Sequence, residues 1–425
     1  MNLNNVSVCV VGLGYVGLPL AIEFGRRYHT VGFDVSKARV DELNSKKDST
    51  REVSEVDFRE SVNLTITHDV AETSNCNVYI VTIPTPVDQA KVPNLDALKA
   101  ATSSVARVLN TGDIVIFEST VFPGATEEVC VPILESLSGM SLNNEFYVGY
   151  SPERINPGDA SKRLTDIVKV TSGSNEYSSE FIDTLYKSII KAGTHKAPSI
   201  KVAEAAKVIE NVQRDVNIAL VNEFAQIFSK EGISTKDVLA AASTKWNFLN
   251  FVPGMVGGHC IGVDPYYLAH RAIVKGLHPE MILAGRRIND NMGAFVASEM
   301  LRTMMRAGVA MREAKVLIIG FTFKENCPDS RNTGVIQAKR AFEEFSISVD
   351  VLDRWADAAF VTAEYGFELV DNPPSSSYDA VLFAVPHRDY VEMGYDWISA
   401  FLKDKTLPIF DLKGALEPAS NVMTL

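Results

Sequence analysis

Short apolar runs alternate with amphipathic helical patterns in the first part of the chain. The runs are rich in β-branched residues and are followed by small or polar residues (glycine, aspartate, proline or serine), which is typical of buried parallel strands that lead into turns. They cover residues 6–11, 30–33, 78–83, 114–118 and 146–150. A helical pattern over residues 18–27 follows the first run. Together these patterns predict a doubly wound parallel sheet.

A helical pattern without proline or glycine occupies residues 199–230, and a second helix is expected over residues 294–307. The first would be about 45 Å long, more than most domains need, so we expect it to act as a spine and a subunit contact. A second α/β pattern begins at Ala314. Its strands are expected over residues 315–320, 349–353, 380–385 and 407–412.

The predicted fold class is therefore α/β, with two doubly wound Rossmann-like domains joined by a long central helix and a helical dimerisation region. We expect an N-terminal domain over residues 1–196, a central helical region over residues 197–308 and a C-terminal domain over residues 309–425.

The turn after the first strand carries the glycine spacing of a dinucleotide-binding motif, where the tight turn, the pyrophosphate and the helix packing each require a small residue. The motif residues are Gly12, Gly14, Tyr15, Val16 and Gly17. The second strand ends at Asp34, where a carboxylate takes the ribose hydroxyls of the cofactor. Asp34 favours NAD because it would repel a 2′-phosphate, although Lys37 and Arg39 leave NADP open, and Arg39 is a further candidate cofactor contact.

Three polar residues follow later strands of the first sheet: Thr85, Thr120 and Glu153. Ligands sit at the carboxyl ends of parallel strands, so these residues are candidates to border the nicotinamide. Each could equally be an ordinary turn or cap residue.

Composition narrows the function. The 425 residues are 46% hydrophobic and carry a net charge of −12, which argues against nucleic acid or an anionic membrane as partner. The five cysteines show neither zinc-type spacing nor a disulfide framework, so we expect no metal and a reduced, cytoplasmic location. The start of the chain lacks the pattern of a signal peptide, and no apolar stretch is long enough to span a bilayer.

Cys260 lies on a glycine-rich loop, residues 253–265, with Asp264 four residues further on. An accessible thiol with an acid in reach suggests a covalent catalyst, although a small buried thiol is the ordinary alternative. On the long helix, Lys207, Asn211 and Arg214 share one face. A solvated polar stripe would also explain that face.

The turn that opens the second α/β stretch lacks the glycine motif and carries Lys324 and Arg331, cations suited to phosphate. A second nucleotide ligand is therefore expected there.

Seven segments, in this order, carry a resemblance over essentially the whole chain: GLGYVG with Asp34, IPTP, FESTVFPG, YSPE, KVIENVQRDVNIALVNE, PGMVGGHCIGVDPYYL and GFTFKENCPDSR. The chain resembles the UDP-glucose/GDP-mannose dehydrogenase family. The resemblance implies that a nucleotide sugar is oxidised at C6 from alcohol to carboxylate in two NAD-dependent hydride transfers.

The resemblance also implies residue roles. Cys260 matches the nucleophile that captures the aldehyde as a thiohemiacetal, whose oxidation gives a thioester. Lys207 and Asn211 match the pair that cradles the C6 oxygen, and Asp264 the acid that orients Lys207 and water. Glu153, with Thr120, would act through water as the base.

Further contacts follow from the same motifs. Lys324 matches a contact to the sugar nucleotide, and Arg331 the arginine that reaches the NAD pyrophosphate. Phe251 and Gly257 are expected to contact the substrate. A homodimer is expected, although the arginine that enters the partner's site in this family has no counterpart in residues 240–252, where Lys245 is the possible substitute.

Arg154, Ile155 and Asn156 follow Glu153 where UDP-glucose enzymes usually continue with Phe-Leu and a second glutamate. This resembles the branch that acts on UDP-N-acetylhexosamines, whose acetamido carbonyl Arg154 or Asn156 could satisfy. UDP-N-acetylglucosamine is slightly preferred over UDP-N-acetylgalactosamine, with UDP-glucose as a further alternative, and the uronate would feed a surface polysaccharide such as capsule or lipopolysaccharide. The rival functions are a two-electron hydroxyacid-type dehydrogenase and a sugar-nucleotide sensor without turnover.

Overall fold

The computed structural model describes residues 3–88, 90–154, 163–258 and 261–425. By their internal contacts these residues form two compact units. Unit 1 contains residues up to 210 together with residues 266–277, and unit 2 contains residues 211–265 and 278–425. The three-part division expected from the sequence is not tested by these units and stays a prediction.

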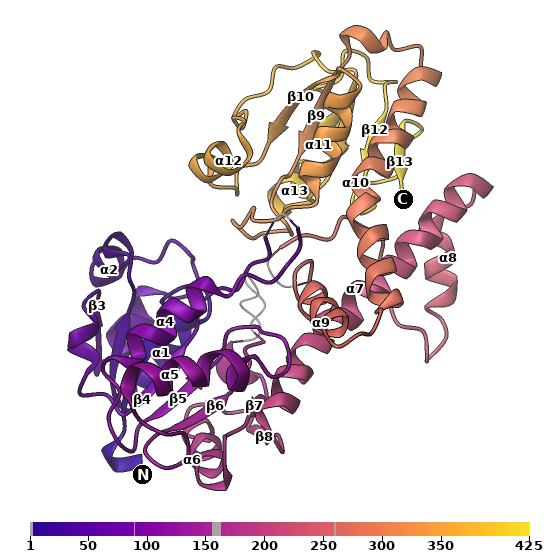
Figure 1. Ribbon diagram of the computed structural model, residues 1–425. Coiled ribbons are helices and arrows are strands. Elements are labelled where there is room, and N and C mark those ends of the chain that lie inside the picture. The colour runs from indigo at the N-terminus through magenta and orange to yellow at the C-terminus, as the bar shows by residue number, and fades with distance from the viewer. Residues whose placement is uncertain (1–2, 89, 155–162, 259–260) are drawn as a thin grey trace. The chain divides into compact units, whose positions relative to one another are not determined.

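Unit 1 is built on a six-stranded parallel sheet with the strand order β3-β2-β1-β4-β5-β6, which is the Rossmann order (Figure 1). Its strands are β1 (Ser7–Val11), β2 (His29–Phe33), β3 (Leu64–Thr67), β4 (Val78–Val81), β5 (Ile114–Phe117) and β6 (Tyr147–Tyr150). The five strands predicted from apolar runs are confirmed. The sequence missed β3 because its Leu-Thr-Ile-Thr run is short and half polar.

Helices cover both faces of this sheet, so β4 and β5 are buried at every position. One face packs against apolar residues of α1 and α6, including Phe24 and Tyr186. The helices of unit 1 are α1 (Gly17–Gly25), α2 (Lys37–Asn44), α3 (Glu55–Glu60), α4 (Asp96–Ala106), α5 (Val131–Ser138) and α6 (Glu176–Lys187). A small parallel pair, β7 (Lys169–Thr171) and β8 (Thr194–Lys196), completes the unit.

The long helix is α7 (Ile200–Glu231), as predicted to within one residue at each end. Three further helices lie around the cysteine loop in the sequence: α8 (Thr235–Ala242), α9 (Asp264–Val274) and α10 (Glu280–Arg306). The expected start of the last helix, at residue 294, was wrong, since α10 begins at Glu280 and includes Gly285 and Gly293. Both glycines lie inside the helix, Gly285 with room for a Cβ at ordinary distance from Val216, and Gly293 too close to Gln337 to admit one.

The second sheet, in unit 2, is five-stranded and parallel, with the order β10-β9-β11-β12-β13. Its strands are β9 (Lys315–Ile319), β10 (Ser348–Leu352), β11 (Ala380–Phe383), β12 (Ile409–Asp411) and β13 (Val422–Thr424). Its helices are α11 (Val335–Glu344), α12 (Ala358–Tyr365) and α13 (Arg388–Ser399). The four predicted strands are present, and the sequence missed the three-residue β13.

The two sheets repeat one structural device. In unit 1, Gly12 has a φ of +92° and the next residue, Leu13, donates its N–H to Asp34 at the end of β2. In unit 2, Gly320 has a φ of +89° and the N–H groups of Phe321 and Thr322 are bound by Asp353 at the end of β10. The second domain therefore shares the turn of the first without its full glycine motif.

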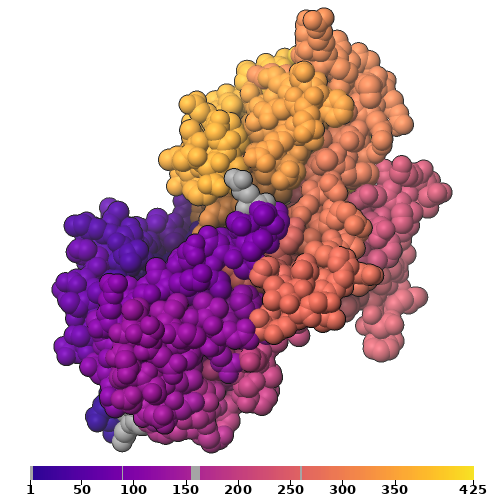
Figure 2. Space-filling view, in the orientation of Figure 1, coloured from indigo at the N-terminus to yellow at the C-terminus, as the bar shows by residue number. Residues whose placement is uncertain are grey.

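Helix α10 packs along α11 through the second core, in which Met300 and Met304 are fully buried. Figure 2 shows the orange residues of this helix and the lighter residues of the sheet domain as one continuous surface. No helix within the described part of the chain is long and apolar enough to cross a membrane.

Candidate active site

The dinucleotide turn has the geometry that its glycines require. A positive φ suits Gly12, and a Cβ on Gly17 would overlap the Gly12 carbonyl oxygen and the Thr82 hydroxyl. Thr82 Oγ1 donates to that same carbonyl at 2.7 Å. The turn therefore packs directly against the start of the helix that follows. The backbone N–H groups at the N-terminus of a helix can bind an anion. Gly14, Tyr15 and Val16 lie on this turn as predicted, and Gly14 has open space where a side chain would stand.

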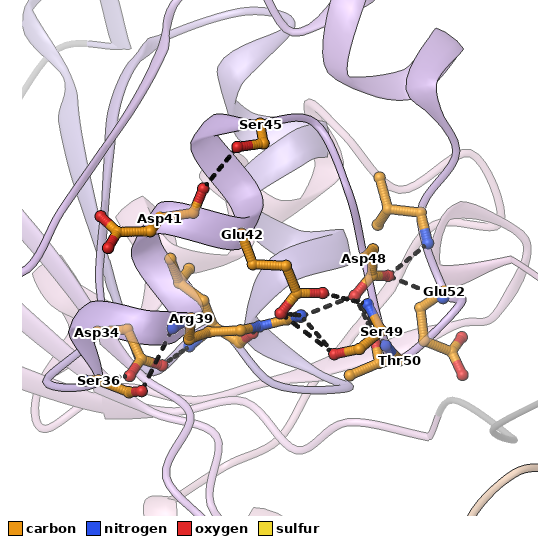
Figure 3. A network of polar contacts seen from close by, with 12 residues as sticks. Asp34, Ser36, Arg39, Asp41, Glu42, Ser45, Asp48, Ser49, Thr50 and Glu52 are labelled. Atoms are coloured by element: carbon orange, nitrogen blue, oxygen red, sulfur yellow. Dashed lines mark hydrogen bonds and ion pairs between the residues drawn. The ribbon is translucent and has the colours of Figure 1, made fainter. Parts of the chain in front are cut away.

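Asp34 and Arg39 hold the same turn from the other side (Figure 3). Asp34 accepts the N–H of Leu13 and that of Ser36, both at 2.9 Å. Arg39 Nε donates to the Leu13 carbonyl at 3.0 Å. Asp34 and Arg39, both predicted to bind the cofactor, therefore fix the N–H and the carbonyl of Leu13.

The guanidinium of Arg39 is itself held in place by carboxylates. It lies 2.8 Å from Asp48 and 3.1 Å from Glu42. Asp48 is almost fully buried and also binds the N–H groups of Thr50, Glu52 and Val53 (Figure 3). Sequence analysis missed Asp48, although an aspartate followed by Ser-Thr is a turn signal. The cofactor contact of Arg39 stays a prediction.

The loops after β4 and β5 are joined at their predicted site residues. The Thr85 hydroxyl donates to the Thr120 carbonyl at 2.5 Å. The buried Tyr267 of α9 donates its hydroxyl to the carbonyls of Thr85, at 2.9 Å, and Pro86, at 3.2 Å. The structure thus brings Thr85 and Thr120 together at the carboxyl edge of the sheet. Sequence analysis had not singled out Tyr267.

A buried glutamate of α7 fixes the same region. Glu204 is fully buried and accepts the N–H groups of Gly124 and Thr126, the latter at 2.9 Å. Burial raises the pKa of Glu204, while the two N–H donors lower it. Because Glu204 precedes Lys207 by one turn of the helix, it ties this part of α7 to the loop after β5. Sequence analysis did not select Glu204.

Lys207 and Asn211 are buried, with exposed fractions of 6% and 0%, so the solvated polar stripe is wrong for this pair. Asn211 Nδ2 donates to Asp264 Oδ2 at 2.5 Å, and Arg214 donates to Asn211 Oδ1 at 3.3 Å. Asp264 is buried at the start of α9. The two predicted site residues Asn211 and Asp264 are therefore in direct contact.

Glu153 is also buried, and its Oε2 lies 3.0 Å from Lys169 Nζ. The next residue, Arg154, pairs with Glu210 at 2.8 Å. Ile155 and Asn156, predicted to contact the substrate, lie outside the described residues. Lys169 was not selected from the sequence, although a lysine inside the apolar run Ile-Val-Lys-Val is a signal for a buried charge.

The loop that leads to the cysteine packs tightly against the second sheet domain. Gly258 has a φ of +83°, and a Cβ there would press on the ring of Phe323. A Cβ on Gly257 would lie 2.8 Å from the Asn332 carbonyl oxygen. Further back, the buried Asn222 of α7 holds Gly254 by two hydrogen bonds, at 2.8 and 3.0 Å. Cys260 itself lies outside the described residues.

Phe251 lines a cavity of about 350 Å³ within unit 2. The other residues that line it include Pro253, Lys236, Lys413 and Leu425. A volume in this range can hold a nucleoside-sized group between apolar walls and cationic side chains. The contact of Phe251 with a substrate stays a prediction.

Lys324 and Arg331 lie on one ordered loop of unit 2. Lys324 lines a second, smaller hollow with Met255 and Lys413. Arg331 makes a bidentate pair with Asp329, with Nε to Oδ1 at 3.0 Å and a terminal nitrogen to Oδ2 at 2.7 Å. The reach of Arg331 to a cofactor stays a prediction.

The buried His387 orders this loop from the side of the sheet. Its Nδ1 accepts the N–H of Asn326 at 2.9 Å, and its Nε2 lies 3.2 Å from Asp353. Burial raises the pKa of Asp353, but the hydrogen bond from His387 and the N–H donors of Phe321 and Thr322 outweigh it and lower that pKa.

No cluster of three or more metal-binding side chains occurs among residues 3–88, 90–154, 163–258 and 261–425. A dinucleotide turn on one parallel sheet and a second doubly wound domain with a cationic loop define the class of protein: a nucleotide-binding α/β protein with two doubly wound domains.

Comparison with known proteins gives the family. Residues 6–190 match the NAD binding domain, residues 201–291 the central domain and residues 317–418 the UDP binding domain of one family. The chain belongs to the UDP-glucose/GDP-mannose dehydrogenase family. Its cofactor is NAD.

Individual relatives match along nearly the whole chain. A UDP-N-acetyl-D-glucosamine 6-dehydrogenase of Pseudomonas aeruginosa is 53% identical over 415 residues, 98% of each chain. One of Salmonella typhi is 54% identical over 414 residues, 97% of each chain. Among solved structures, a UDP-D-ManNAc dehydrogenase of Pyrococcus horikoshii is similar with a TM-score of 0.89 at 29% identity, covering 99% of this chain and 98% of its own.

Proposed function

We propose that this protein oxidises the C6 hydroxymethyl group of UDP-N-acetyl-D-glucosamine to a carboxylate, with two NAD reduced per sugar. The observation that carries the proposal is the pair of relatives of this activity, each more than half identical over at least 97% of the chain. Every residue that the chemistry requires is present in the sequence at its expected motif position.

The N-terminal turn suits the cofactor. Gly14, with open space where a side chain would stand, lets the backbone approach a pyrophosphate, and Asp34 presents a carboxylate to ribose hydroxyls while it holds the turn. Thr85 and Thr120 border the nicotinamide in the proposal. When bound, NAD supplies the hydride acceptor for both oxidations.

In this proposal Cys260 is the residue that forms a covalent bond to C6 of the substrate. Its thiolate adds to the C6 aldehyde formed in the first oxidation and gives a thiohemiacetal, which the second oxidation converts to a thioester. Water then attacks the thioester carbonyl, the C–S bond breaks and the thiolate leaves. A thiolate suits this sequence because it is both a good nucleophile and a good leaving group.

Lys207 and Asn211 stabilise the negative charge that develops on the C6 oxygen in the proposed reaction. Their burial supports this role, because a cation and an amide act most strongly on a developing charge where water is excluded. Asp264 holds the Asn211 amide by the hydrogen bond described above. Glu153 accepts the proton of the attacking water, with Thr120 nearby on the water path.

The uridine diphosphate half binds in unit 2 in this proposal. Phe251 and Gly257 border the nucleotide, Lys324 contacts the sugar nucleotide, and Arg331 reaches toward the cofactor pyrophosphate. The cavity beside Phe251 supports the first of these roles, since it combines apolar walls with Lys236 and Lys413. Arg154 and Asn156 take the acetamido group.

We further propose a cytoplasmic homodimer that supplies a uronate for surface polysaccharide. Exposed apolar residues on and just after α7 support self-association: Leu220, Ile227 and Ile233 are each nearly half exposed. Cys9, Cys76 and Cys130 are buried free thiols, as a reducing compartment allows. Light scattering of the purified protein would show about twice the mass of one chain, and a monomer at micromolar concentration would contradict the dimer.

Initial rates of NAD reduction with three sugars test the substrate. Purified protein with saturating NAD is given UDP-N-acetylglucosamine, UDP-N-acetylgalactosamine or UDP-glucose in separate reactions. We expect kcat/KM to be at least about tenfold higher for the first, a difference worth about 1.4 kcal/mol of transition-state binding. A preference for either of the other sugars would overturn the proposed substrate.

A further inference from the structure

Three charged side chains meet in the interior of unit 1, and only Glu153 among them has a predicted role. Glu118 follows β5, Glu153 lies three residues after β6, and Lys169 begins β7. The side chains of Glu118, Glu153 and Lys169 are 0%, 7% and 3% exposed. Three separate segments therefore deliver two carboxylates and one ammonium to one buried place.

The ammonium bridges the two carboxylates. Lys169 Nζ lies 2.6 Å from Glu118 Oε2 and 3.0 Å from Glu153 Oε2. The Tyr186 hydroxyl donates to the other oxygen of Glu118, and Lys169 Nζ also stands 5.3 Å from the centre of the Tyr186 ring. The contacts form a chain from Tyr186 through Glu118 and Lys169 to Glu153.

The two carboxylates differ in how firmly they are held. Glu118 has a charged partner on one oxygen and a buried hydroxyl on the other, and it has no exposed surface. Glu153 has Lys169 on one oxygen, its neighbour's N–H on the other, and some exposed surface. Glu118 therefore anchors the lysine, and Glu153 is the end of the chain that can meet a ligand.

The lysine keeps its charge in this setting. Burial lowers the pKa of Lys169, but the charges and hydrogen bonds of Glu118 and Glu153 outweigh it, so that pKa lies above its ordinary value. Burial is also the largest influence on Glu118 and raises its pKa. A buried ammonium with two acidic partners is a fixed positive charge at neutral pH.

Stability alone is a poor reason for such a cluster. Burying three charges costs desolvation, and apolar side chains of similar volume are often as stable or more so. Here the cluster lies just beyond the carboxyl ends of β5 and β6, the edge at which parallel sheets bind ligands. Its location suits a role in orientation better than a role in packing.

We propose that Lys169 is a positioning residue for Glu153: its ammonium, anchored by Glu118 and Tyr186, fixes the carboxylate that takes a proton from the water attacking the Cys260 thioester. This inference rests on the proposed function. In the step, the water oxygen bonds to the thioester carbon, its proton passes to Glu153, and the C–S bond breaks to release the thiolate. A misplaced Glu153 slows this step and leaves the acyl group on the enzyme.

The test compares Lys169→Gln with the wild type in the full-length protein with NAD and UDP-N-acetylglucosamine. We expect kcat to fall by about a hundredfold, the low end of what a general base contributes, with KM for both ligands changed less than about threefold. Samples quenched during turnover and measured by intact mass should carry the acyl adduct, which the wild type should not accumulate. Lys169→Arg, which keeps the charge, should recover part of the rate.

Lys187→Gln is the matched control. Lys187 also holds a carboxylate, that of Asp183 at 2.6 Å, but its side chain is 58% exposed, so this ion pair is open to solvent. This variant should keep the wild-type kcat and carry no adduct. Wild-type kcat in folded Lys169→Gln, or slow turnover without an adduct, would overturn the inference.

A second variant covers the case in which Lys169→Gln fails to fold. Glu118→Gln keeps the shape of the anchor but removes its charge and one of its two acceptor oxygens, so we expect kcat to fall about tenfold with the same adduct. An unchanged kcat in this variant would overturn the inference. Two outcomes separate the claims: no NAD reduction by the wild type overturns the proposed function and the inference together, whereas normal turnover by the wild type and both variants overturns only the inference.

Discussion

At the scale of single residues, the loops of unit 1 are fixed by buried carboxylates. Asp48, Glu204 and Glu118 each bind two or more donors, and each lies beside a residue that the sequence had selected for function. The motifs were enough to predict which residues meet ligands, and those roles stay predictions. The sequence did not identify the buried carboxylates that hold these residues in place, because those carboxylates act through contacts between segments that are distant in the sequence.

Asp48→Asn tests the support of the dinucleotide turn. The change removes one of the two ion pairs that hold Arg39, which in turn holds the Leu13 carbonyl. We expect KM for NAD to rise about fivefold, the effect of about 1 kcal/mol, with KM for the sugar unchanged. Steady-state kinetics with each ligand varied in turn measures both values.

Asp41→Asn is the control for this change. Asp41 lies on the same helix as Arg39 (Figure 3). It pairs with Lys37, but its side chain is 62% exposed. It should leave KM for NAD within about twofold of the wild type, as exposed ion pairs contribute little. An equal rise in both variants would show that the network does not act through Arg39.

Asp113→Asn tests a pH dependence of stability. Asp113 is buried beside the start of β5 and accepts the N–H of Asn110 at 2.8 Å. Burial raises the pKa of Asp113 to about 6, although the bond from Asn110 opposes it. A raised pKa in the folded state means that this group stabilises the fold below about pH 4 and that the contribution is lost as the pH rises through 6.

The Asn side chain cannot ionise, so the free energy of unfolding of the variant should increase relative to that of the wild type between pH 4 and pH 8. We expect the gain to reach about 2 kcal/mol in the free energy of unfolding, measured by urea denaturation at several pH values. A difference between variant and wild type that is constant with pH would refute the raised pKa.

At the scale of elements, changing either of two glycines of α10 to alanine should have opposite effects on the free energy of unfolding. A Cβ at Gly293 would lie 2.6 Å from the Gln337 Cβ and 2.7 Å from the Ala338 nitrogen of α11, closer than atoms can pack. Gly293→Ala should therefore lower the free energy of unfolding by about 2 kcal/mol. Thermal denaturation of the purified variant gives the value.

Gly285→Ala is the matched change on the same helix. There a Cβ meets Val216 and Ala219 at 3.5 and 3.6 Å, an ordinary contact. Because alanine favours helix over glycine, this variant should be as stable as the wild type or more stable by up to about 1 kcal/mol. A loss as large as that of Gly293→Ala would contradict the packing described for α10.

The elements also show how far the sequence could predict the fold. Continuous apolar runs identified nine of the strands, because strands buried on both faces need no polar alternation. The sequence did not predict four short strands, β3, β7, β8 and β13. A run of three or four residues that includes polar ones is too short to show a strand pattern. The start of α10 was also missed; glycine disfavours a helix on propensity alone, whereas Gly293 inside α10 admits the neighbouring helix α11.

At the scale of the whole molecule, one family match runs through the N-terminal, central and C-terminal segments. The proposed chemistry accordingly draws on groups from all three: Glu153 from the first, Cys260 from the second and Lys324 from the third. A two-electron dehydrogenase would need neither the cysteine loop nor the C-terminal domain. The number of electrons removed from each sugar therefore separates the proposed function from that rival.

The most direct measurement is the yield of NADH per UDP-N-acetylglucosamine consumed, with excess NAD and purified protein taken to completion. The account predicts two NADH per sugar and a uronic acid as the product. One NADH per sugar, with an aldehyde or ketone as product, would contradict the thioester route through Cys260. Tight binding of both ligands with no NADH formed would show instead that the protein is a sensor.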